Sequence, residues 1–133
     1  MTDGDVTGPA ATVTRIAADE LRETDRTPGM TRRQAFAGNG VWSGTATTAA
    51  GSVSAWHHHG EHESTIYVVR GALHMEFGAG GRESFDAVAG DFVHVPAGAV
   101  HRESNTDAEP SLLVVVRCGR GEPTVNVDGP APG

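Results

Sequence analysis

Four histidines and two glutamates fall within eight residues of this chain, at positions 56–63, which read WHHHGEHE. Imidazole and carboxylate groups are common ligands of divalent transition metals in proteins. In an extended strand alternate side chains share a face, so His57 and His59 would point one way and His58 the other. Two imidazoles on one face supply two of the three or four ligands that such a metal needs. This stretch therefore predicts a metal site.

The remaining ligands are not fixed by this spacing. His62 and Glu63 come three and four positions after His59, and either side chain could turn back toward a metal. His101 follows an expected turn at residues 95–99, VPAGA, and opens a later strand. Spacing alone does not bring His101 to the first cluster, so the full ligand set is open at this level.

The elements that would position these side chains are short strands. Apolar segments rich in Val, Thr and aromatic residues alternate with glycines every eight to twelve residues, a pattern typical of an all-β sandwich or barrel. We expect one domain over residues 12–120, with an N-terminal tail at 1–11 and a C-terminal tail at 121–133, both rich in small and polar residues. The expected strands are 13–16, 32–36, 41–47, 53–57, 65–69, 72–77, 83–88, 92–95, 100–104 and 112–117, and 17–25 is the one candidate helical turn.

Charge and composition exclude several classes of function. The chain of 133 residues carries 17 acidic against 10 basic side chains, a net charge of −7, which argues against binding to nucleic acids or anionic membranes. Every basic residue is arginine, so Schiff-base chemistry and a phosphate-binding loop with its lysine are excluded. The single cysteine, Cys118, and the lack of a secretion signal or long apolar run predict a cytoplasmic protein.

Two motifs in this order give the chain a resemblance to the cupin superfamily. The first is residues 51–63, GSVSAWHHHGEHE, followed by Gly71; the family pattern is Gly, five residues, His-x-His, three or four residues, Glu, six residues, Gly. The second is residues 90–105, GDFVHVPAGAVHRESN, which matches Gly, five residues, Pro-x-Gly, two residues, His, three residues, Asn throughout. In the first motif seven residues, rather than six, separate Glu63 from Gly71, and the residue separated from this glycine by six residues is Ser64.

The resemblance implies a cupin-type double-stranded β-helix, a jelly-roll barrel, that binds one divalent transition metal. By position in the motifs it implies His57, His59, Glu63 and His101 as ligands, with a bulge absorbing the extra residue before Gly71. His62 is the alternative fourth ligand. Iron, manganese, nickel, zinc and copper all suit such a ligand set.

Open coordination positions on such a metal imply chemistry or ligand capture. Small cupins include dioxygenases, isomerases, cyclases and lyases whose small oxygenated substrates chelate the metal, and we expect an enzyme of this kind, with a dioxygenase favoured. Glu63 could also leave the metal and act as a base. The alternative is a binding or sensing module without turnover. The resemblance further implies a homodimer, with a small molecule as substrate or ligand.

Overall fold

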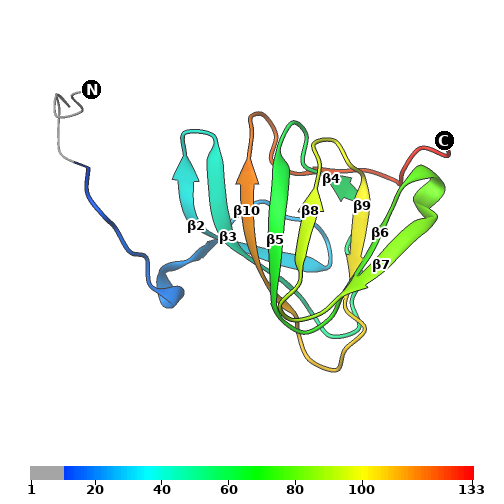
Figure 1. Ribbon diagram of the computed structural model, residues 1–133, viewed down its shortest axis with the longest axis horizontal. Helices are drawn as coiled ribbons and strands as arrows, with labels where there is room; N and C mark the ends of the chain where they lie inside the picture. The colour runs from blue at the N-terminus through cyan, green and yellow to red at the C-terminus, as the bar shows by residue number, and fades with distance from the viewer. Residues whose placement is uncertain (1–10) are drawn as a thin grey trace.

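The chain folds into two antiparallel sheets in a computed structural model that describes residues 11–133 (Figure 1). The six-stranded sheet has the order β1-β2-β3-β10-β5-β8, and the five-stranded sheet has the order β11-β4-β9-β6-β7. The strands are β1 Arg22–Glu23, β2 Met30–Gly38, β3 Val41–Thr48, β4 His57–His58, β5 Glu63–Arg70, β6 Leu73–Phe77, β7 Glu83–Ala87, β8 Phe92–Val95, β9 His101–Ser104, β10 Leu112–Cys118 and β11 Val125–Asn126. The predicted all-β, double-stranded β-helix fold is confirmed.

The core lies between the two sheets and follows from alternation along the strands. In β5 the even-numbered residues Ser64, Ile66 and Val68 are buried, while their odd-numbered neighbours face outward. In β10, Leu113 and Val115 are buried in the same way. Burying one face of each strand removes its apolar side chains from water, which is the main force that holds two such sheets together. The apolar core consists of Trp42, Ala46, Ile66, Val68, Leu73, Met75, Ala87, Val93, Val95, Leu113 and Val115.

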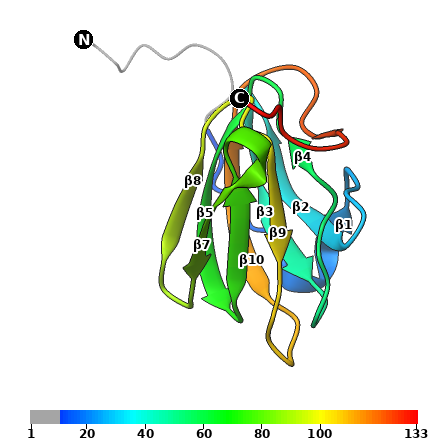
Figure 2. The ribbon, with the colours of Figure 1, turned by 90° about the vertical axis from the view of Figure 1, so that its right-hand side faces the viewer.

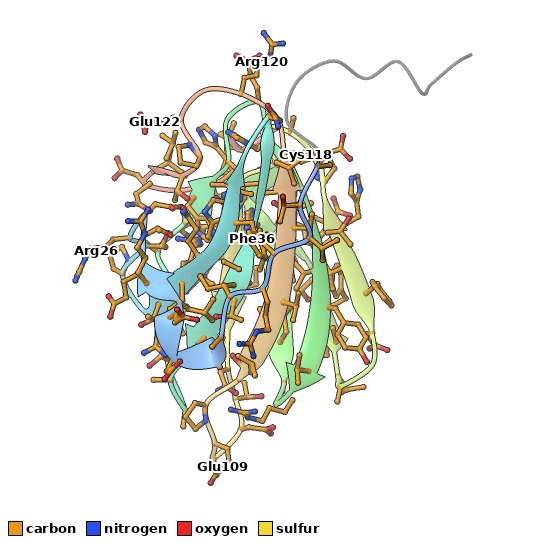
Figure 3. The ribbon with its side chains drawn as sticks, turned by 90° about the vertical axis from the view of Figure 1, so that its left-hand side faces the viewer. Arg26, Phe36, Glu109, Cys118, Arg120 and Glu122 are labelled. Atoms are coloured by element: carbon orange, nitrogen blue, oxygen red, sulfur yellow. The ribbon has the colours of Figure 1, made fainter. Side chains whose placement is uncertain are left out.

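The outer face of the six-stranded sheet is apolar in its middle. Tyr67 of β5 lies opposite Val114 of β10 on one side and Phe92 of β8 on the other. Tyr67 and Phe92 stack with ring centroids 4.9 Å apart, and Phe92 is 71% exposed. In Figure 3 this sheet faces the viewer, with Cys118 at one end of β10 and Glu109 in the loop at the other end. A contiguous exposed apolar face of this kind is typical of an interaction surface.

Three of the expected elements differ in the structure. Residues 13–16 belong to no strand, and the expected helical turn is a short 3-10 helix at Ala18–Glu20. The expected strand at 53–57 contributes one isolated bridge at Val53 and the first residue of β4. Within the described residues no helix is long and apolar enough to cross a membrane.

The C-terminal segment adds strand β11, which pairs with β4 beside the histidine cluster. Val125 lies opposite His58 and Asn126 opposite His57, and the amide of Val127 donates a hydrogen bond to the carbonyl of Trp56. Figures 1 and 2 show this segment, in orange to red, passing close to β4 on its way to the C-terminus. The segment expected to be a tail thus lies against the strand that carries His57 and His58.

Candidate metal centre

Three histidines meet between the two sheets. His57 begins β4 and lies opposite His101 of β9, while His59 follows β4 directly. Their exposed fractions are 0%, 2% and 5% for His57, His101 and His59. One ring nitrogen of each lies within 4.8 Å of the other two. The structure therefore brings together the two histidines of the first motif and the histidine of the second.

Each of these rings is oriented by a hydrogen bond from its Nδ1 to a backbone carbonyl. A ring that donates through Nδ1 keeps the lone pair of Nε2 free to accept a hydrogen bond or bind a metal. Such bonds fix the tautomer and the direction of metal-binding histidines. The acceptors are the carbonyls of Ala55 for His57 at 2.9 Å, Pro123 for His59 at 2.8 Å and Ala99 for His101 at 2.9 Å.

The surroundings of two of these histidines keep them neutral. Burial, with a smaller contribution from His101, lowers the pKa of His57 to about 3. Burial, followed by the charge of Arg117, lowers the pKa of His59 to about 2. A buried imidazolium is costly because the charged form loses its hydration. At neutral pH both rings therefore present lone pairs, the form that binds metals.

Two further charged side chains lie at the cluster, and the sequence reasoning did not select either as a site residue. The guanidinium Nη2 of Arg32, on β2, lies 3.2 Å from Nε2 of His57, and its Nη1 donates to the hydroxyl of Thr27 at 2.7 Å. Glu103 of β9 is 2% exposed, with Oε2 at 3.6 Å from Nε2 of His57 and 3.8 Å from Nε2 of His101. Glu103 shares strand parity with His101, and this is the signal that could have found it.

The two residues predicted as the fourth ligand lie elsewhere. Glu63 begins β5 with its side chain on the outer face of the sheet, 64% exposed, and its Oε1 lies 3.2 Å from Nε2 of His94. His62 is buried, and its Nε2 lies 3.1 Å from the carbonyl oxygen of Gly121. Neither side chain belongs to the group of three histidines. The assignment of Glu63 or His62 to the metal remains a prediction from the family pattern.

The donor set fits a divalent transition metal. Three imidazole nitrogens and a nearby carboxylate are the ligand types that iron, manganese, nickel, zinc and copper accept. Nε2 of His101 is buried and has no hydrogen-bond partner anywhere in residues 11–133. A buried polar atom without a partner costs free energy, which a bound cation would recover. The cluster can therefore hold a metal, and three protein nitrogens leave coordination positions for other ligands.

A cavity of about 320 Å³ has His101 in its wall. Most of the wall is apolar, contributed by β6, β7, β8 and the loop before β9. The lining residues are Met75, Phe77, Phe85, Val93, His94, Val95, Pro96, Ala99 and His101. This combination of apolar walls and two histidine side chains is typical of a small-molecule site.

Comparison with known proteins gives the family. The family model described as a cupin domain matches residues 44–117, more than half of the chain, and the chain belongs to this family. Comparison with curated proteins finds no match. Similar solved structures share the fold at low sequence identity, and these likenesses show the fold alone.

Three of these solved structures come from bacteria and align with most of this chain. An uncharacterized conserved protein with a double-stranded β-helix domain, from Klebsiella pneumoniae, is 21% identical with a TM-score of 0.69, over 86% of this chain and 98% of that one. The polyketide cyclase RemF from Streptomyces resistomycificus is 18% identical with a TM-score of 0.70, over 87% and 86% of the two chains. A mutant of the Bacillus subtilis oxalate decarboxylase OxdC is 22% identical with a TM-score of 0.70, over 94% of this chain and 36% of that one.

Proposed function

We propose that this protein is a metal-dependent enzyme that acts on a small oxygenated organic molecule with an apolar body. The observation that carries the proposal is the convergence of three buried, oriented imidazoles, one of which lines the apolar cavity. A substrate whose carbonyl, enolate or carboxylate oxygen binds the metal would place its carbon skeleton against Met75, Phe77 and Phe85. Burial of that skeleton would supply affinity, and the oxygen atoms would supply orientation.

The residues around the cluster would have different roles in this reaction. His57, His59 and His101 would hold the metal, and their carbonyl partners keep the rings from turning away. When bound, a divalent metal acts as a Lewis acid toward a coordinated oxygen or activates dioxygen. The apolar walls exclude water from the reacting group, which strengthens every charge interaction there. Arg32 supplies a positive charge beside His57.

We favour a dioxygenase reaction, as predicted from the family resemblance. The same arrangement would suit an isomerase, a cyclase or a lyase, since in each a bound metal would supply Lewis-acid polarisation of a substrate oxygen. The fold shared with a polyketide cyclase supports including cyclisation of poly-oxygenated carbon chains among the reactions tested. We expect the enzyme to act in the cytoplasm on small molecules, without nucleic acid or membrane partners.

The test is turnover by protein reconstituted with a single metal. Untagged protein is stripped of metal, loaded anaerobically with Fe(II), and mixed with β-diketones and flavonols while oxygen consumption is recorded. Parallel samples with Mn(II), Ni(II) or Zn(II) are analysed for rearranged or cyclised products by mass spectrometry. We expect turnover by the wild type and none by His101→Ala. Ligand binding without turnover under every metal would instead support the alternative, a metal-dependent binding or sensing module.

We also propose that two copies of the chain assemble as a homodimer. Support comes from the exposed apolar face formed by Phe92, Tyr67 and Val114 on the six-stranded sheet, together with Val69 and Val116. An exposed face of this kind is a liability in a single copy and becomes a stable contact when two copies cover it. A monomer in analytical ultracentrifugation at micromolar concentration would contradict the homodimer.

A further inference from the structure

The carboxylate of Glu103 is placed by its strand. Side chains two residues apart on a strand share a face, so Glu103 points inward with His101 while Arg102 between them points away. Arg102 pairs with Glu76 at 2.8 Å on the other face of the sheet. Glu103 is therefore held in the interior by the same alternation that orients His101, and its position does not depend on a flexible loop.

The environment of this carboxylate calls for a cation. Oε1 of Glu103 is buried without a hydrogen-bond partner in the part of the chain that the structure describes. Oε2 lies 3.6 Å from Nε2 of His57 and 3.8 Å from Nε2 of His101. Nη2 of Arg32 lies 3.2 Å from Nε2 of His57, beside the same atoms. A buried carboxylate that is not fully paired destabilises the folded protein, and a metal ion among these atoms would offset that penalty.

Glu63 cannot reach these atoms without a rearrangement of β5. Its side chain lies on the outer face of the six-stranded sheet, and the next residue, Ser64, points inward with its buried hydroxyl. Because the side-chain period of a strand is two, bringing Glu63 inside would turn Ile66 and Val68 out of the core. The single extra residue before Gly71 thus leaves a serine, a poor metal ligand, at the inward position.

The geometry points to Glu103 as the carboxylate ligand of the metal, in place of Glu63. This inference rests on the proposed function and specifies its metal site as His57, His59, His101 and Glu103. The second motif then provides both an imidazole and a carboxylate from one strand. Glu63 and His94 form a separate pair on the outer surface.

The test compares two matched variants, Glu103→Gln and Glu63→Gln, each of which removes one charge and keeps the side-chain volume. Metal-free protein is titrated with Mn(II), and free Mn(II) is measured by its electron paramagnetic resonance signal. We expect Glu103→Gln to weaken Mn(II) binding at least about tenfold and Glu63→Gln to change it less than about twofold. Thermal unfolding of the metal-free proteins checks whether each variant is folded.

The outcomes distinguish a failure of the ligand assignment from a failure of the proposed function. Unchanged Mn(II) affinity in Glu103→Gln, or weaker binding in Glu63→Gln, would overturn the ligand assignment and leave the metal site standing. Absence of Mn(II), Fe(II) and Zn(II) binding by the wild type would overturn the proposed function and this inference together. If Glu103→Gln does not fold, a crystal structure of Mn(II)-loaded wild type decides, because a glutamate oxygen of residue 103 must then lie within bonding distance of the metal.

Discussion

Acid should destabilise the metal-free protein through two buried histidines. In the folded state the pKa values of His57 and His59 are about 3 and about 2, against about 6.5 in the unfolded chain. Below pH 6.5 the unfolded chain therefore binds protons that the folded chain does not, and stability falls as the pH falls. Each histidine lowers the free energy of unfolding by about 1.4 kcal/mol for each pH unit below about 6.5. At pH 5 the two together lower it by about 4 kcal/mol. Single domains are stable by only about 5 to 15 kcal/mol.

The assay is urea unfolding of the metal-free protein at pH 7.5 and pH 5, for the wild type and for His59→Gln. The glutamine has no proton to gain, so about 2 kcal/mol of the pH dependence should disappear in the variant. Carboxylates elsewhere titrate equally in both proteins and cancel in the comparison. An identical loss of stability in the two proteins would refute the account of His59 as a buried neutral imidazole.

Three further predictions follow from particular contacts. Asn105→Ala should lower the unfolding free energy by about 2 to 4 kcal/mol, because the buried amide donates to the carbonyls of Thr48 and Glu109; equal urea midpoints would contradict this. Phe92→Asp should yield a single copy in gel filtration, because a charge there is costly to bury between two copies; an unchanged dimer would place the contact elsewhere. Arg32→Gln should tighten Mn(II) binding about tenfold, because the guanidinium competes for the lone pair of His57 and repels the cation; weaker binding would refute that competition.

The fold was largely predictable because its determinants are local. Alternating apolar residues define β5 and β10, and the two motifs identify the family with its strand order. Strands β1 and β11 were missed because each has only two residues, too few for a periodic pattern. The region around residues 13–16 has apolar residues but no partner strand, and a strand exists only where its backbone groups find partners.

The candidate site was predictable in part. His57 and His59 follow from parity within one stretch, and His101 follows from the second motif. Glu63 was selected by its spacing after His59. Strand parity gave a contrary signal, because Glu63 shares a face with Thr65 and Tyr67, and in the structure this is the outer face of β5. Arg32 could not be found in this way, because its approach to His57 depends on how one sheet packs on the other.

The most direct test of the central claim is the anomalous scattering of a crystal of untagged protein grown with Mn(II), Fe(II) or Zn(II). We predict one strong peak per chain, about 2.0 to 2.2 Å from Nε2 of His57, His59 and His101. An oxygen of Glu103 should lie at a similar distance, and Arg32 should have moved away from His57. The absence of an anomalous peak at the three histidines in saturating metal, or a peak between Glu63 and His94 instead, would contradict the account.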